Sequence, residues 1–153
     1  MNIVLLEPEI PMNTGNIGRT CVLTNSVLHL IRPLGFQLTD REIRRSGLDY
    51  WPHLQLFVYD DLADFRKQNP AARCFYATTK AKRYYADVRY TKEDFIFFGK
   101  ESKGLPKDLL AENENRTIRI PMDTKYARSL NLSNSVAVVL YEGLRQNGFT
   151  DLE

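Results

Sequence analysis

The chain has 153 residues, of which 43% are hydrophobic and 26% are charged, and its formal net charge at pH 7 is +2. This size and composition predict one domain, residues 1–153, with enough apolar residues for a full core. No stretch approaches the ~20 apolar residues of a membrane helix, and no export signal is recognisable, so we expect a soluble cytoplasmic protein. A net charge this small does not by itself require a nucleic-acid partner.

Strand-like and helix-like segments alternate along the chain. The strand-like segments are short and rich in Val, Ile, Leu and Phe, as strands covered on both faces are; they are residues 2–6, 27–31, 54–58, 74–78, 94–98 and 117–120. The helix-like segments are residues 15–24, 40–46, 62–68, 107–111 and 133–146. This alternation predicts an α/β fold with a mostly parallel sheet and helices on both faces.

The last predicted helix is apolar nearly all round. Ser133 can cap its N-terminus, and Tyr141 lies on the face opposite the main apolar stripe. A helix of this kind is buried on nearly all sides, so we expect it to pack on a second subunit in a homodimer; a monomer with a central helix is the alternative. The stripe and the other apolar positions are Val136, Val139, Leu140, Gly143 and Leu144, with Ala137 and Val138.

Several common chemistries find no support in the sequence. Cys21 and Cys74 each lie in an apolar segment, which favours buried thiols over a disulfide. His29 and His53 are the only histidines, and no Cys/His spacing suits zinc, so we expect structural or surface histidines and no metal. Glu7-Pro8-Glu9 stands where a dinucleotide-binding enzyme has its glycine-rich turn, which weighs against, without excluding, a small-molecule α/β enzyme.

Three polar segments follow three of the predicted strands. They are residues 12–19 (MNTGNIGR), 99–106 (GKESKGLP) and 121–135 (PMDTKYARSLNLSNS). Open α/β sheets bind ligands outside the carboxyl ends of their strands, so these segments predict one composite pocket.

The first segment has a polar stripe that carries one arginine. Asn13 or Thr14 can cap a helix, and Asn16, Arg19 and Thr20 then share one face of it. An arginine on such a stripe suits a phosphate or carboxylate. A capped surface helix with a solvated Arg19 is the alternative.

The segments NTGNIGR, FFGKESKGLP and IPM…RSLNLSNSVAVVLYE resemble the three signature motifs of the SPOUT (SpoU–TrmD) RNA methyltransferases. EPEIPMNTGNIGRT and RRSGLDYW resemble the TrmL-type branch, which methylates the ribose of the anticodon wobble nucleotide. The resemblance covers about residues 2–148. It implies a C-terminal trefoil knot and a homodimer through the N- and C-terminal helices. It also implies methyl transfer from S-adenosylmethionine to the 2′-hydroxyl of cytidine or uridine 34 in leucine tRNAs.

The resemblance also implies roles for individual residues. Arg19 would clamp a phosphate and polarise the 2′-oxygen, Glu101 would hold Arg19, and Asn13 and Asn131 would position the ribose or the loop backbone. S-adenosylmethionine would be held, mostly by backbone groups, at Ala77, Gly99, Ile120, Ser129 and Leu130.

Without an added RNA-binding domain, the dimer itself would grip the anticodon stem-loop. The expected RNA-binding residues are Arg44, Arg45, Tyr50, Lys103 and Arg128, with partial core packing as the alternative for Tyr50 and its neighbour Trp51. Two further alternatives are the same reaction on another tRNA position or on ribosomal RNA, and an RNA-binding module without turnover.

Overall fold

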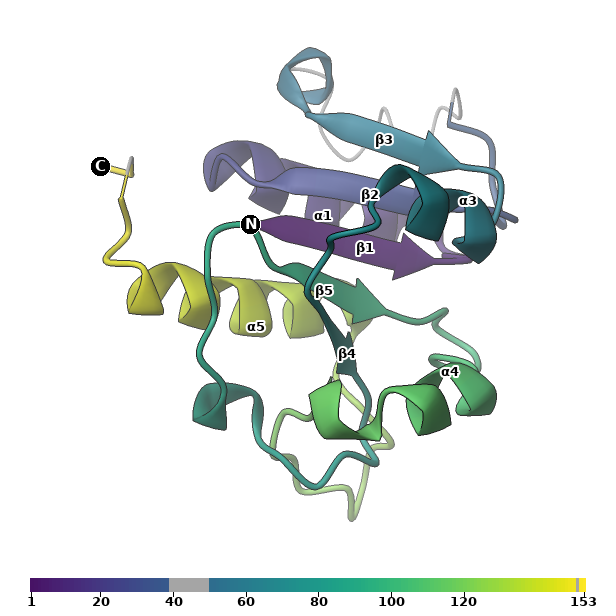
Figure 1. Ribbon diagram of the computed structural model, residues 1–153, viewed down its shortest axis with the longest axis vertical. Coiled ribbons are helices and arrows are strands. Elements are labelled where there is room, and N and C mark those ends of the chain that lie inside the picture. Colours follow the sequence, from purple (N-terminus) through teal and green to yellow (C-terminus); the bar gives the residue numbers. More distant parts are fainter. Residues whose placement is uncertain (39–49, 151) are drawn as a thin grey trace.

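The computed structural model describes residues 1–38, 50–150 and 152–153. A six-stranded sheet in the order β3-β2-β1-β5-β4-β6 forms its centre (Figure 1). Each pairing between these strands is parallel, which confirms the predicted α/β class. The strands are β1 (Asn2–Leu6), β2 (Val27–Ile31), β3 (Leu56–Tyr59), β4 (Cys74–Ala77), β5 (Phe95–Phe98) and β6 (Thr117–Ile118).

Helices cover both faces of the sheet. Side chains alternate along β1, so Ile3 and Leu5 join the core beneath α1 and α5, while Val4 and Leu6 join the core beneath α3 and α4. The α-helices are α1 (Pro11–Leu23), α3 (Leu62–Gln68), α4 (Lys107–Glu112) and α5 (Leu132–Gln146). Short 3₁₀ turns are η1 (Trp51–His53), η2 (Tyr85–Asp87) and η3 (Glu114–Arg116).

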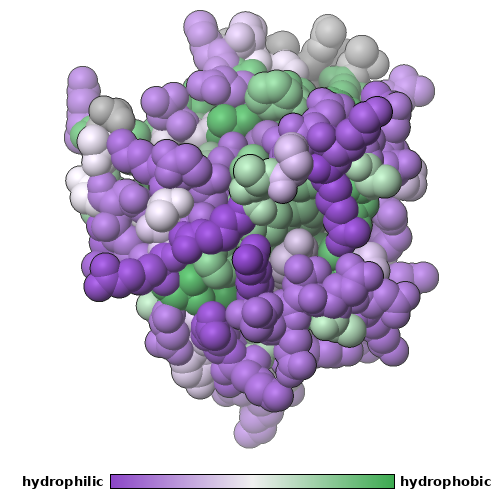
Figure 2. Space-filling model, in the orientation of Figure 1, coloured by the Kyte–Doolittle hydropathy of each residue, from purple (hydrophilic) through white to green (hydrophobic). Residues whose placement is uncertain are grey.

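The face that carries α3 and α4 is only partly covered. These helices have 7 and 6 residues, against 15 for α5. Figure 2 shows a mostly hydrophilic surface with apolar patches near the middle of this face.

No helix within the described parts of the chain is long and apolar enough to cross a membrane.

The strand order reverses between β1 and β5. From β1 the chain steps outward to β2 and β3, whereas β4 and β6 lie beyond β5 on the other side. Crevices at such reversals, outside the carboxyl ends of the strands, are where open α/β sheets bind ligands. The segments that follow β1 and β5 are the first and second of the three polar segments, so the fold brings these two together.

Several element boundaries differ from the predictions. α1 begins at Pro11 rather than at the predicted residue 15, so all of residues 12–19 are helical, and Asn13 and Thr14 lie inside the helix. Proline suits the first helical turn because its missing N–H would be unpaired there. The helix predicted at 62–68 is confirmed, and the helix predicted at 40–46 lies outside the described residues. Four strands differ from the predictions by one or two residues: β3 at both ends, and β4, β5 and β6 at one end each, at Ala77, Phe95 and Ile118.

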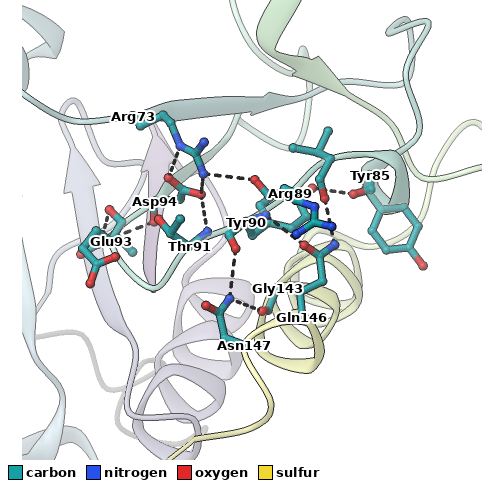
Figure 3. Close-up of polar contacts among 12 residues, drawn as sticks. Arg73, Tyr85, Arg89, Tyr90, Thr91, Glu93, Asp94, Gly143, Gln146 and Asn147 are labelled. Carbon is teal, nitrogen blue, oxygen red and sulfur yellow. Dashed lines mark hydrogen bonds and ion pairs between the residues drawn. The ribbon is translucent and has the colours of Figure 1, made fainter.

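A polar cluster fastens the chain before β5 to the end of α5 (Figure 3). The buried carboxylate of Asp94 accepts hydrogen bonds from Arg73 Nε at 2.6 Å and Nη2 at 2.5 Å, and from the Thr91 backbone N–H at 2.7 Å. The Tyr90 backbone N–H donates to Gln146 Oε1 at 2.9 Å, and Asn147 Nδ2 donates to the Tyr90 carbonyl at 3.3 Å. Both polar groups of the Tyr90 backbone are therefore held by side chains at the end of α5.

The cysteines are buried as predicted, and one of the two histidines is buried as well. Cys21 and Cys74 are free thiols in the core, and burial raises the pKa of Cys21 to about 12. His29 lies between β1 and β3, with Nδ1 2.9 Å from Tyr59 Oη and Nε2 3.1 Å from Asn2 Oδ1. Burial lowers the pKa of His29 to about 4, so the imidazole is neutral at physiological pH.

The last helix is only partly as predicted. Its stripe of Val136, Val139 and Leu140 is buried, as are Gly143 and Leu144. Tyr141, in contrast, is 48% exposed, so a single chain does not bury α5 on all sides.

Candidate active site

The carboxylate of Glu101 joins the first two polar segments. Glu101 follows β5, and its Oε2 accepts a hydrogen bond from the Glu9 backbone N–H at 2.8 Å. Its Oε1 accepts from the Ile10 backbone N–H at 3.2 Å and from Asn13 Nδ2 at 3.0 Å. The N-terminus of a helix has unpaired N–H groups and a partial positive charge. A carboxylate in this position stabilises the start of α1 and fixes it against the loop after β5.

Asn13 extends this network to the third segment. Its Oδ1 accepts a hydrogen bond from Asn131 Nδ2 at 3.0 Å. Asn131 Oδ1 in turn accepts from the backbone N–H of Ser133 at 2.8 Å and from its hydroxyl at 2.7 Å. Asn131, rather than the predicted Ser133, therefore caps α5. Glu101, Asn13 and Asn131 come from all three segments, and the structure brings them into one continuous chain of hydrogen bonds.

In a second set of contacts, side chains from the segment before α1 bind the loop after β5. The carboxylate of Glu9 accepts hydrogen bonds from the Ser102 backbone N–H at 2.9 Å and from its hydroxyl at 2.8 Å, and these donors lower the pKa of Glu9. Lys100 Nζ donates to Glu7 Oε2 at 2.6 Å, and this bond raises the pKa of Lys100. The sequence did not predict these contacts, although the opposite charges in EPE and GKES were a signal that could have paired them.

Arg19 lies exposed on α1, while Ile17 and Cys21 on the same helix are fully buried, as the predicted helix face requires. Within the described residues, no hydrogen bond or ion pair reaches the Arg19 guanidinium. Glu101 does not hold Arg19 in this structure, because its two oxygens are taken by Glu9, Ile10 and Asn13. As far as the described residues show, the exposed Arg19 guanidinium has no protein partner and can meet a ligand.

Three of the expected cofactor residues stand at one edge of the sheet. Ala77 ends β4, Gly99 follows β5 and Ile120 lies just beyond β6, and β4 pairs with both β5 and β6. A side chain at Gly99 would collide with the backbone of Gly104, which closes the loop by donating its N–H to the Lys100 carbonyl at 2.8 Å. Only glycine fits at position 99 of this closed loop.

The main chain of residues 120–130, next to this edge, makes few hydrogen bonds with the backbone of the described residues. Ser129 and Leu130 lie in an exposed stretch, and no backbone N–H from residue 120 to 130 donates to a backbone carbonyl of the described residues. Unpaired backbone groups beside small and apolar side chains suit a ligand that is bound through the main chain. The residues expected to hold S-adenosylmethionine therefore fit that group.

The expected RNA-binding residues have different surroundings. Lys103 and Arg128 are exposed within the second and third segments. Tyr50 is half-buried, and its hydroxyl donates to the Gly15 carbonyl of α1 at 2.5 Å, so it also supports that helix. Arg44 and Arg45 lie outside the described residues. No group of three or more His, Cys, Asp or Glu side chains that could hold a metal occurs in the described parts of the chain.

The sequence profile of the SpoU rRNA Methylase family matches residues 1–141. The chain belongs to this family. As a member of the SpoU rRNA methylase family, it has relatives that match along nearly the whole of its length. A protein of Geobacillus stearothermophilus is 52% identical over 99% of this chain and 98% of its own length. The tRNA (cytidine(34)-2′-O)-methyltransferase of Burkholderia cenocepacia is 47% identical over 97% of this chain and 96% of its own.

The fold of this chain is also similar to that of solved structures. A solved structure that concerns the 2-OH methylation of C/U34 on tRNA superposes with a TM-score of 0.90. It is 42% identical to this chain, and the superposition covers 96% of this chain and 95% of that one.

Proposed function

We propose that this chain is a tRNA (cytidine/uridine-34) 2′-O-methyltransferase that acts on the wobble nucleotide of leucine tRNAs. The observation that carries the proposal is the hydrogen-bonded chain of Glu101, Asn13 and Asn131 beside Arg19, which is unpaired among the described residues. The full-length similarity to a tRNA (cytidine(34)-2′-O)-methyltransferase supports the choice of substrate. Because tRNA would be the substrate, the proposal places the protein in the cytoplasm.

S-adenosylmethionine would supply the methyl group and would be held at the edge formed by Ala77, Gly99 and Ile120, with Ser129 and Leu130. A 2′-hydroxyl is a weak nucleophile until its proton leaves, so orientation and charge stabilisation supply most of the rate. An arginine side chain keeps its proton at neutral pH, which makes it a poor general base. Arg19 therefore clamps the adjacent phosphate and polarises the 2′-oxygen.

Asn13, Glu101 and Asn131 have a positioning role in this proposal. Their hydrogen bonds hold the start of α1, the loop after β5 and the start of α5 at fixed separations. This arrangement keeps the Arg19 helix at a constant place relative to the edge that would hold the methyl donor. Errors of about 1 Å in such a placement cost on the order of 100-fold in rate.

A homodimer through the N- and C-terminal helices is part of the proposal. Leu23 at the end of α1 and Tyr141 on α5 are exposed, and with Phe149 and Leu152 they line a hollow of about 540 Å³. Exposed apolar groups gathered at one place are typical of an interface. The trefoil knot is also part of the proposal, and the contacts of Tyr90 with Gln146 and Asn147 would hold the loop around α5.

The test is to methylate bulk unmodified tRNA with labelled S-adenosylmethionine, digest it and map the labelled nucleoside. We expect label on the 2′-oxygen of nucleotide 34. Label elsewhere in tRNA, or only in ribosomal RNA offered in parallel, would replace the proposed substrate. RNA binding without any transfer would indicate a binding module.

Replacing Arg19 by Lys tests the assigned role of that residue. Lysine keeps the charge but loses the planar fork that grips a phosphate with two hydrogen bonds. We expect Arg19→Lys to retain partial tRNA binding and to lose most of its turnover, measured as separate Kd and kcat values. Undiminished turnover in this variant would rule out the clamp.

A further inference from the structure

The loop between β6 and α5 carries an aromatic ring that the fold does not use. Tyr126 is 88% exposed, and its ring belongs to neither of the hydrophobic core clusters that the described residues form. In Figure 1 this yellow-green loop runs along the lower end of the molecule, beyond the sheet. A ring exposed to this degree gains almost nothing from the hydrophobic effect, so folding does not account for its position.

Positive charges flank this ring. Lys125 Nζ lies 5.0 Å from the centre of the Tyr126 ring, within the range of a cation–π contact. The backbone N–H of Lys125 donates to Asp123 Oδ1 at 3.0 Å, which gives the loop a local turn just before the ring. Arg128 follows, and it is exposed as well.

The same loop leads directly into the candidate active site. Ser129 and Leu130 come next, and Asn131 is bonded to Asn13 on the Arg19 helix. The chain from Tyr126 to Asn131 spans at most ~17 Å. The ring therefore stands within reach of nucleotides that neighbour one bound at the active site.

We propose that Tyr126 is a stacking platform for an unpaired base of the RNA substrate, with Lys125 and Arg128 contacting the adjacent phosphates. Unpaired bases are held in this way by aromatic rings, and phosphates by neighbouring cations. The inference rests on the proposed function and adds to it a contact with a nucleotide other than the one methylated.

The test compares Tyr126→Ala and Tyr126→Trp with the wild type. An RNA hairpin carrying the anticodon loop, with 2-aminopurine beside the wobble nucleotide, reports stacking as quenched fluorescence. We expect Tyr126→Ala to weaken hairpin binding about 5- to 150-fold, the range measured for loss of one base–aromatic stack, and to lose the quenching. Tyr126→Trp keeps a flat ring and should bind within about 2-fold of the wild type. The affinity for S-adenosylmethionine should not change in either variant.

Phe57 provides the matched control. It is 52% exposed on β3, at the opposite edge of the sheet from β6, so Phe57→Ala removes an exposed ring remote from the loop. Phe57→Ala should bind the hairpin as the wild type does. Sedimentation of each variant checks whether the ring serves a protein contact instead.

Two results would overturn the inference: unchanged hairpin affinity and quenching in Tyr126→Ala, or a change in oligomeric state that accounts for its weaker binding. The binding measurement does not depend on turnover. Wild-type protein that stacks the hairpin but transfers no methyl group would therefore contradict the proposed function alone, and wild-type protein that binds no RNA would contradict both.

Discussion

At the scale of single residues, Glu101 has more contacts than its place in a surface loop suggests. Its carboxylate accepts hydrogen bonds from two backbone N–H groups before α1 and from Asn13. The charge matters because a glutamine in its place would direct an NH₂ group at one of these donors. Each hydrogen bond to a charged group is worth about 1.5–3 kcal/mol.

We expect Glu101→Gln to lower kcat about 10- to 100-fold, because the Arg19 helix loses its fixed distance from the loop after β5. The free energy of unfolding should fall by about 1–3 kcal/mol in the same variant. Single-turnover methylation and urea unfolding measure the two effects. Glu112→Gln is the control, since Glu112 makes one exposed ion pair with Arg66 and should change neither quantity appreciably. An unchanged kcat in Glu101→Gln would remove Glu101 from the site.

At the scale of elements, the ion pair of Arg73 with Asp94 in the polar cluster of Figure 3 holds the segment before β5 in place. The Asp94 side chain is 1% exposed, whereas its partner Arg73 is 45% exposed. Removing the arginine leaves a buried carboxylate whose remaining partner among the described residues is the Thr91 N–H, while removing the carboxylate leaves an arginine that water can reach.

Arg73→Ala should therefore destabilise the protein more than Asp94→Asn does. We expect the free energy of unfolding to fall by about 2–3 kcal/mol in the first variant and about 1–2 kcal/mol in the second. Arg66→Ala breaks an exposed pair and should cost under about 1 kcal/mol. Urea titrations of the three variants rank them, and a larger loss for Asp94→Asn would show that the arginine, rather than the carboxylate, needs its partner.

Local patterns predicted the kind of each element better than its ends. All six strands were predicted because each is a short apolar run between polar stretches. The start of α1 was placed four residues too late, because a sequence offers only local caps such as Asn13 and Thr14. The carboxylate at the start of the helix belongs to Glu101, which accepts from the backbone N–H groups of Glu9 and Ile10 just before α1 and lies far away in the chain. A start fixed by such a distant residue leaves no signal in the segment itself.

For the candidate site too, the sequence predicted one aspect and left another open. The residue types at Arg19, Glu101 and Asn131 were identified from the three segments. Their contacts were not, because the pairing of Glu101 with Arg19 was an implication of the family resemblance, and the sequence does not show which donors reach the carboxylate. In the structure, neutral backbone N–H groups take the carboxylate, and Arg19 is left unpaired among the described residues. Likewise, asparagine and serine are both common helix caps, so residue type does not decide between Asn131 and Ser133. In the structure Asn131 is the cap, and its side chain also donates a hydrogen bond to Asn13.

At the scale of the whole molecule, the exposed side of α5 leads to the proposed homodimer. Tyr141 is 48% exposed on a helix whose other face is fully buried, and Leu23 is exposed at the end of the neighbouring α1. Burying a large apolar side chain contributes about 1.5–3 kcal/mol. An aspartate at either position would instead place a charge in the interface, at a cost of several kcal/mol.

We expect wild-type protein to sediment as a dimer at micromolar concentration, and Tyr141→Asp and Leu23→Asp to shift it toward monomer by at least ~100-fold in Kd. If the dimer forms the RNA-binding surface, as proposed, the monomeric variants should also lose tRNA affinity while they remain folded by circular dichroism. Phe57→Asp charges an equally exposed apolar position on β3 and should leave the dimer intact. A wild-type monomer at micromolar concentration would refute this assembly, and a dimer unaffected by either aspartate would place the interface elsewhere on the molecule.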